Sequence, residues 1–168
     1  RLTCIGEMNW QKLKLELLKP SSQNDPRTTP KLRLYLAGET PIQHALYELL
    51  NNNIQQIGLS AAKDRHIEIS SDSLQPVGFE SDESLLDYEP RSFIGYRLLH
   101  EYFSFPNKFM FFDLYNLDKI DSSFDKELNI TFYFSDFQRS EYMKRLEQAV
   151  QADTFRLGCT PIINLFKQ

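Results

Sequence analysis

Lys31–Leu59 reads KLRLYLAGETPIQHALYELLNNNIQQIGL and has the pattern of a strand, a helix and a second strand. Lys31–Leu36 alternates polar and apolar side chains, which is the period of a half-buried strand. The dipeptide Thr40–Pro41 predicts the N-cap and the first position of a helix. Apolar residues then recur at helical spacing, and these are Ile42, Ala45, Leu46, Leu49 and Leu50. A closing strand is predicted at Ile57–Leu59.

The same order of elements returns towards the C-terminus. Phe109–Leu117 is an apolar run, which predicts a central strand buried on both faces. Leu128–Phe134 alternates, Ser140 can cap a helix, and Phe155–Leu157 predicts a closing strand. The apolar face of that helix consists of Tyr142, Met143, Leu146 and Val150. We interpret the two segments as copies of one unit, and the alternative is a coincidence of common α+β patterning.

The first copy also needs a first strand, and the alternating run Trp10–Leu18 supplies it. The predicted fold class is therefore α+β, with two tandem ββαβ-like units, mainly antiparallel sheet and a helical, aromatic-rich connector. The predicted boundaries are 1–73 for the first unit, 74–106 for the connector and 107–168 for the second unit. The pattern is compatible with one shared sheet and with two separate lobes.

The connector contains Val77–Pro106, VGFESDESLLDYEPRSFIGYRLLHEYFSFP. Asp82–Ser84 predicts a short helical turn. Arg91–Phe103 predicts a helix because large apolar residues recur three or four positions apart, and Pro106 must follow that helix. We expect most of these aromatic residues to pack in a core. The residues that share the predicted apolar face are Phe93, Tyr96, Leu99 and Phe103.

Some residues of the connector are also candidates for contact with another protein. Tyrosine suits a surface that a partner half covers, and arginine is enriched in protein interfaces. The predicted partner-binding residues are Tyr88, Arg91, Arg97, Tyr102 and Phe105. For the two arginines the alternative is a buried, paired side chain, whose removal would lower stability instead of binding.

Length and composition are those of a globular protein. The 168 residues fit one domain or two small ones, with 41% hydrophobic and 25% charged residues. A net charge of -4 and a pI near 5.4 give no general attraction to nucleic acid. Cys4 and Cys159 are predicted to be buried free thiols, with a bridge between them as the alternative. The chain begins at Arg1 without a signal peptide, and we expect a fragment of a longer protein.

The residues that could carry chemistry do not form a known motif. His44, His66 and His100 are far apart, and we expect His66 in a polar loop. Glu80 and Glu83 resemble a carboxylate pair for acid–base work, but their polar neighbours favour solvent over the buried pocket that such a pair needs. We therefore predict no enzyme activity, no cofactor and no metal.

The acidic run between the two copies is predicted to be a solvated loop or a face for basic partners. Its carboxylates are Asp82, Glu83, Asp87 and Glu89. Their spacing differs from an EF-hand loop and lacks the central glycine. A glycine-rich phosphate loop and a nucleophile elbow are also absent from the sequence.

Several motifs resemble one protein family. These are LRLYLAGE at Leu32–Glu39, ALYELL at Ala45–Leu50, the connector with the following strand at Val77–Leu114, and FRLGCTPIINLF at Phe155–Phe166. They closely resemble TssF, also called VasA or ImpG, a baseplate subunit of bacterial type VI secretion systems. Family chains are several times longer, so the resemblance implies an interior fragment. Asp87–Glu89 departs from the family, which often has proline-rich, less acidic residues there.

The resemblance implies a non-enzymatic scaffold. TssF resembles a wedge protein of contractile phage-tail baseplates, and two copies assemble with one TssG and contact TssE and TssK. The implied location is the cytoplasm, with the baseplate docked onto the inner-membrane complex below the contractile sheath. No catalytic residue is implied.

Two alternative functions each require a particular arrangement of residues. A peptide- or carbohydrate-binding module would collect Tyr88, Tyr96, Tyr102 and Tyr142 in one concave pocket. An enzyme completed by further domains would cluster its histidines with carboxylates.

Overall fold

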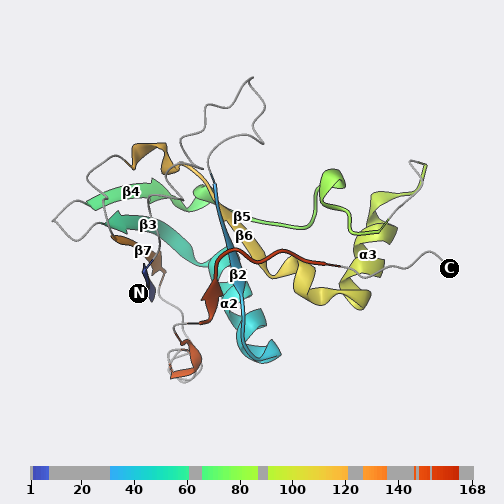
Figure 1. The fold of residues 1–168 in the computed structure, drawn as a ribbon, viewed down its shortest axis with the longest axis horizontal. Coiled ribbons are helices and arrows are strands. Elements are labelled where there is room, and N and C mark those ends of the chain that lie inside the picture. The colour runs from blue at the N-terminus through green and yellow to red at the C-terminus, as the bar shows by residue number, and fades with distance from the viewer. Residues whose placement is uncertain are drawn as a thin grey trace.

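The computed structural model describes residues 2–7, 31–60, 66–86, 91–120, 127–135, 146, 148–151 and 153–162. These residues form two four-stranded antiparallel sheets and two α-helices (Figure 1). The predicted α+β class with antiparallel sheets is confirmed.

The first sheet has the strand order β1-β7-β3-β4. Its strands are β1 (Leu2–Glu7), β7 (Glu127–Phe134), β3 (Ile54–Ser60) and β4 (His66–Ser70). In the centre of this sheet Ile57 lies opposite Phe132, and both side chains are fully buried. The alternation predicted for β7 therefore places its apolar face on the core.

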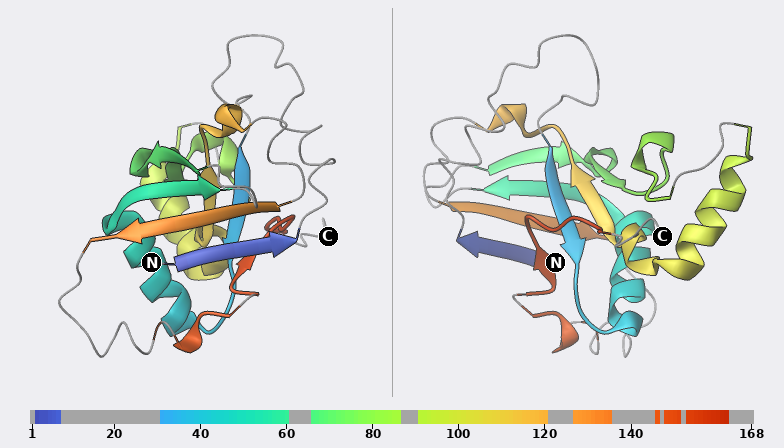
Figure 2. Two further views of the ribbon diagram at one scale, coloured as in Figure 1. Left: turned by 90° about the vertical axis from the view of Figure 1, so that its left-hand side faces the viewer. Right: turned by 45° about the vertical axis from the view of Figure 1, so that its right-hand side comes forward.

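The second sheet has the strand order β5-β6-β2-β8. Its strands are β5 (Leu74–Pro76), β6 (Phe111–Leu114), β2 (Leu32–Leu36) and β8 (Phe155–Arg156). All four residues of β6 are buried, so the prediction of a central, doubly buried strand is confirmed. Figure 2 shows the strands of this sheet running across those of the first sheet.

Each sheet contains strands from both predicted copies. Strand β2 of the first copy pairs with β8 of the second, and β7 of the second copy pairs with β3 of the first. The second strand of each copy is therefore hydrogen-bonded to the closing strand of the other copy. The predicted boundaries at residues 73 and 106 stay predictions, but strand pairing crosses them in both sheets.

Helix α2 (Thr40–Asn52) joins β2 to β3 and packs on the core with its apolar face. The buried residues of that face are Ala45, Leu46, Leu49 and Leu50. The prediction of Thr40 as N-cap is wrong by one position, because Glu39 is the N-cap and is the residue with extended backbone angles. The side chain of Glu39 makes no capping hydrogen bond.

Helix α3 (Ile94–Ser104) belongs to the connector and lies at the end of the molecule away from the first sheet (Figure 1). The 3₁₀ turn η4 (Pro106–Phe109) follows it, so the prediction that Pro106 ends the helix is confirmed. The predicted turn near Asp82 is the 3₁₀ turn η3 (Ser81–Glu83). Two further 3₁₀ turns are η2 (Ser71–Ser73) and η5 (Leu117–Lys119).

Two predictions of local structure need correction. His66 begins strand β4 instead of lying in a loop, because His66–Ser70 pairs along the edge of β3. The strand predicted over 109–117 is shorter, because 3₁₀ turns occupy both of its ends. The predicted strand Trp10–Leu18 and the helix start at Ser140, with Tyr142 and Met143, lie outside the described residues.

Candidate protein-interaction surface

Helix α3 has its charged residues inside and its apolar residues outside. The two buried residues of the helix are Arg97 and Glu101. Phe103 is 80% exposed, Phe93 is 69% exposed and Tyr96 is 68% exposed. The expectation that most of these aromatics pack in a core is therefore wrong. We define the α3 surface as the exposed side chains Phe93, Ile94, Tyr96, Leu99, Tyr102 and Phe103.

Aromatic contacts keep the side chains of the α3 surface in place. Phe93 meets Tyr96 edge-to-face, with ring centroids 5.9 Å apart, and Tyr102 meets Phe103 in the same way at 5.5 Å. The Tyr102 ring also lies 6.0 Å from the buried Phe109 ring. Such pairs are favourable geometries for aromatic rings. Clusters of exposed apolar side chains are typical of surfaces that contact a protein, a membrane or a ligand.

An apolar groove runs between α3 and α2 beside this surface. Its volume is about 340 Å³. The lining residues are His44, Tyr47, Phe79, Leu98, Leu99, Tyr102, Phe109 and Met110. Burial raises the pKa of the Tyr47 phenol, so the hydroxyl stays neutral. We call this feature the α2–α3 groove.

Two buried charges on the inner face of α3 hold the segment 79–86 against the helix. The Arg97 guanidinium donates hydrogen bonds to the carbonyl oxygens of Ser81 at 2.9 Å, Glu80 at 2.8 Å and Phe79 at 3.4 Å. Because Arg97 is 5% exposed, these bonds are shielded from water. The Arg97 guanidinium is therefore bonded to carbonyl groups of its own chain and is not available to a partner.

Glu101 is the second of these charges and is fully buried. Its Oε1 accepts hydrogen bonds from the backbone N–H groups of Leu85 at 2.8 Å and Leu86 at 3.3 Å, and its Oε2 is paired with the Lys108 ammonium. Burial alone would raise the pKa of the Glu101 carboxyl. The hydrogen bonds from Lys108 and the backbone outweigh burial and hold this pKa below its ordinary value.

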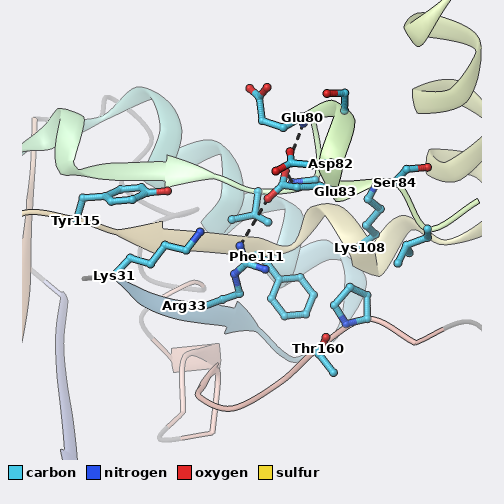
Figure 3. A pocket seen from close by; sticks show the side chains of 15 residues that line it. Lys31, Arg33, Glu80, Asp82, Glu83, Ser84, Lys108, Phe111, Tyr115 and Thr160 are labelled. Carbon is cyan, nitrogen blue, oxygen red and sulfur yellow. Dashed lines mark hydrogen bonds and ion pairs between the residues drawn. The ribbon is translucent and has the colours of Figure 1, made fainter. Parts of the chain in front are cut away.

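A charged cleft of about 670 Å³ lies on the other side of the segment 79–86 (Figure 3). Its walls come from the η3 turn, from β6 and the residues after it, and from the start of β2, with Thr160 of the C-terminal segment opposite. The Arg33 Nη2 lies 3.6 Å from Glu83 Oε1 and so joins β2 to η3. Each cation of the cleft contacts a carboxylate: Lys31 and Arg33 contact Asp113, and Lys108 contacts Glu101.

Asp113 is buried beneath this cleft and neutralises two cations. Arg33 donates to both carboxylate oxygens at 2.7 Å, and the Lys31 Nζ lies 2.6 Å from Oδ2. Burial raises the pKa of Asp113, but the hydrogen bonds from Arg33 and Lys31 outweigh it and keep the pKa below the ordinary value. The same carboxylate raises the pKa of Lys31 despite partial burial. These pairs stabilise the junction of β2 with β6.

The structure separates the five predicted partner-binding residues. Arg91 and Tyr102 are exposed, and Phe105 is half-buried directly after α3. Arg97 is buried and bonded to the chain's own backbone, as the alternative for the arginines required. Tyr88 lies outside the described residues.

The other candidate residues have structural surroundings. Glu80 and Glu83 form a capping box on η3, and the Gly78 N–H donates to Glu83 Oε2 at 2.6 Å. His66 lies 3.4 Å from Glu68 at the edge strand. In the described ranges, no group of three or more His, Cys, Asp or Glu residues is placed to hold a metal ion. Cys159 is a free, half-buried thiol.

The tyrosines required for a binding module do not all gather in the α2–α3 groove. Tyr102 lines the groove but Tyr96 does not. Tyr88 and Tyr142 lie outside the described residues. The groove leaves no local signal in the sequence, because Phe79 and Met110, which line it, lie on opposite sides of α3 along the chain. No helix in the described part of the chain is long and apolar enough to span a bilayer.

Comparison with known proteins gives a consistent result. The family described as "Type VI secretion system, TssF" matches residues 2–168. The type VI secretion system component TssF1 of Pseudomonas aeruginosa is 34% identical over 144 residues, which cover 84% of this chain. A chain in the cryo-electron microscopy structure of the type VI secretion system TssK-TssF-TssG baseplate subcomplex superposes with a TM-score of 0.67 at 29% identity, covering 81% of this chain.

These matches cover only part of each relative. The chain spans 22% of TssF1 and 25% of the chain in the solved complex. The family match nevertheless extends over nearly the whole of the chain. The fold and the sequence together show that the chain belongs to the TssF family of the type VI secretion system.

Proposed function

We propose that this chain is a non-catalytic, structural part of a type VI secretion baseplate wedge, in which it contributes to assembly with TssG and TssK. TssE and a second TssF copy are further proposed partners of the full-length protein. The proposed location is the cytoplasm, where the baseplate docks onto the inner-membrane complex below the contractile sheath. Membership of the TssF family and the solved TssK-TssF-TssG subcomplex support this proposal.

The observation that carries the proposal is the reversed polarity of α3. A helix at the surface of a globular protein normally turns its apolar face to the core. Here Arg97 and Glu101 face inward and the aromatic side chains face outward. An assembly subunit gains from this arrangement because a partner can bury the aromatic side chains, whereas an isolated protein leaves them in water.

We further propose that Arg91, Tyr102 and the α3 surface contact a partner. Phe105 and Tyr88 complete the proposed set on sequence grounds. Arg97 acts on stability instead, because its guanidinium is already bonded to three backbone carbonyl groups.

Co-purification with tagged, full-length TssG and TssK tests the proposal. The wild-type chain should be retained by at least one of them. Phe103→Ser should weaken retention about tenfold or more, because truncation of a hot-spot side chain at the centre of an interface costs about 2 kcal/mol or more. Ile162→Ser is the matched control, since Ile162 is also 80% exposed but lies in the C-terminal segment.

A folded wild-type chain that neither protein retains would contradict the proposed assembly role. Equal loss of retention with Phe103→Ser and Ile162→Ser would contradict the assignment of the interface to α3. Deletion of residues 91–106 is a poorer test, because it removes the buried Glu101 and its bonds to the segment 79–86.

A further inference from the structure

We infer that the segment 79–86 and helix α3 form one rigid arm, and that this arm closes the charged cleft by turning towards β2. The described parts of the arm are residues 79–86 and 91–105. The inference goes beyond the proposed function, because it concerns a motion within the chain and needs neither TssG nor TssK. Closure of the cleft would change the direction in which the α3 surface is presented.

The arm leaves the second sheet and returns to it at one place. Strands β5 and β6 are hydrogen-bonded neighbours, and the Val77 N–H extends their pairing by donating to the Phe111 carbonyl at 3.0 Å. Gly78 then has a φ of 108°, a backbone angle that favours glycine, and Pro106 follows α3 at the other end. Figure 1 shows α3 standing away from both sheets. The arm can therefore turn about one pivot while every strand pair is kept.

Buried charges hold the arm together internally. The Arg97 guanidinium donates to the carbonyl groups of residues 79–81, and the Glu101 carboxylate accepts from the N–H groups of residues 85 and 86. Hydrogen bonds to charged groups are roughly twice as strong as neutral ones, and both of these side chains are shielded from water. The segment 79–86 and α3 should therefore move together.

The contacts between the arm and the two sheets are more exposed. The Arg33 Nη2 lies 3.6 Å from Glu83 Oε1, and an ion pair between partly exposed side chains contributes little to stability. The arm reaches the core through partly exposed apolar side chains. These are Phe79, Leu98 and Tyr102. The arm is thus bound more firmly within itself than to the sheets.

Open space lies on both sides of the arm. The α2–α3 groove of about 340 Å³ is on one side, and Phe79 lines it. The charged cleft of about 670 Å³ is on the other side, and residues 80–85 line it. Close-packed elements leave few voids larger than a water molecule between them. The arm therefore has room to turn, and a turn towards β2 narrows the cleft and widens the groove.

Opposite charges face each other across the cleft (Figure 3). The η3 wall carries three carboxylates. These are Glu80, Asp82 and Glu83. On the β2 wall Lys31 and Arg33 share the one buried carboxylate of Asp113, which leaves one positive charge in excess. Lys108 also lines the cleft, but Glu101 neutralises it. The two walls therefore attract each other, and salt weakens this attraction because the facing side chains are in contact with solvent.

Double electron–electron resonance on the complete chain tests the inference. The native Cys4 and Cys159 are replaced by serine, and nitroxide labels are attached to introduced cysteines. Tyr96→Cys with Glu68→Cys measures the arm against the first sheet. Glu48→Cys with Glu68→Cys is the matched control, since both of its labels lie outside the arm. All three labelled positions are exposed.

The arm pair should give a distance distribution about twice as broad as the control pair, because a body that turns about a pivot takes up a range of positions. Its mean should shift by about 3 Å or more, the width of one water layer, between low salt and about 1 M salt, where screening acts within about 3 Å. The mean of the control pair should stay the same.

Neutral variants assign the shift to the cleft. Glu80→Gln with Asp82→Asn should move the arm-pair mean in the same direction as salt and should reduce the remaining salt shift about twofold or more. Glutamine at position 80 can still accept the capping hydrogen bond of η3. Glu39→Gln is the matched control, because Glu39 is exposed, makes no capping bond and does not line the cleft.

Hydrogen exchange separates turning from unfolding. The N–H groups of residues 85 and 86 should keep their protection in high salt, because salt screens the buried Glu101 much less than the exposed carboxylates. Loss of this protection in salt would show that the arm unfolds, and would overturn the inference.

Four results of the distance measurements would also overturn it. These are equal widths for the arm and control pairs, an arm-pair mean that does not respond to salt, a salt shift that survives Glu80→Gln with Asp82→Asn, and an equal effect of Glu39→Gln. Co-purification with TssG and TssK is a separate measurement, so either conclusion can fail while the other holds.

Discussion

Replacement of Glu101 by glutamine tests whether the buried charges keep α3 in its reversed orientation. Glutamine has the same shape and can still accept the hydrogen bond from the Leu85 N–H. It cannot neutralise Lys108, which is 3% exposed and would keep an uncompensated charge in the interior. Removal of one partner of a buried ion pair costs about 3–5 kcal/mol.

The retained backbone bond places Glu101→Gln at the lower end of that range, at about 3 kcal/mol. For a chain of this size that cost corresponds to a fall in Tm of about 6–12 °C. Urea unfolding followed by circular dichroism measures the free energy of unfolding. Glu48→Gln is the matched control, because Glu48 is exposed on α2 and its replacement should change stability by less than about 0.5 kcal/mol.

A double-mutant cycle tests whether the loss of stability in Glu101→Gln comes from the buried charge of Lys108. Glu101→Gln with Lys108→Met removes both charges, so it should recover about 2 kcal/mol relative to the sum of the single variants. Additive losses, or a cost of less than about 1 kcal/mol for Glu101→Gln, would refute the claim that this pair is a coupled buried unit.

Three further predictions concern stability. Asp113→Asn should cost about 2 kcal/mol at neutral pH, less than the loss from a fully buried pair, because Arg33 and Lys31 are 36% and 32% exposed and water can solvate them; because the folded pKa of Asp113 lies below its unfolded value of 3.8, its stabilisation is present above that pH and lost as the pH falls, so acid titration of unfolding should be shallower in the variant. Gly58→Ala should cost about 1 kcal/mol, the lower end of overpacking costs, because an added Cβ would lie 2.7 Å from the ring of the exposed His66, which can move, and 3.1 Å from the Tyr133 ring; the cost in thermal unfolding should be smaller in a His66→Ala background and would be the same if the His66 ring were not the obstacle. Arg97→Lys should lower hydrogen-exchange protection in the segment 79–86 while that of β3 and β7 is kept, and unchanged protection of the Glu83 N–H, which donates to the Glu80 carbonyl that Arg97 also holds, would contradict the role given to the guanidinium.

The spacing of apolar residues correctly predicted the helices and strands in which the apolar residues are the buried ones or a proline sets the end. Strand β2, helix α2 and the end of α3 before Pro106 are of this kind. Strand β4 was missed because His66–Ser70 is a short edge strand with mostly exposed side chains, so it lacks a strong apolar signal. The pairing between the two copies is non-local and leaves no trace in a local pattern.

The candidate surface was predicted only in part for a related reason. Spacing placed Phe93, Tyr96 and Phe103 on one face of a helix, and the structure confirms that face. Spacing does not say whether such a face points inward. The answer depends on the segment 79–86, whose backbone groups accept and donate the hydrogen bonds that let Arg97 and Glu101 be buried.

The exchange of closing strands between the two copies also determines when the chain can fold on the ribosome. Strand β2 is made early, yet its neighbours β6 and β8 lie at residues 111–114 and 155–156. Strand β3 likewise lacks its neighbour β7 until residues 127–134 have been synthesised. The nascent chain therefore carries unpaired strand edges until almost all of this region has been synthesised, and it depends on late, cooperative closure and on protection from aggregation in the meantime.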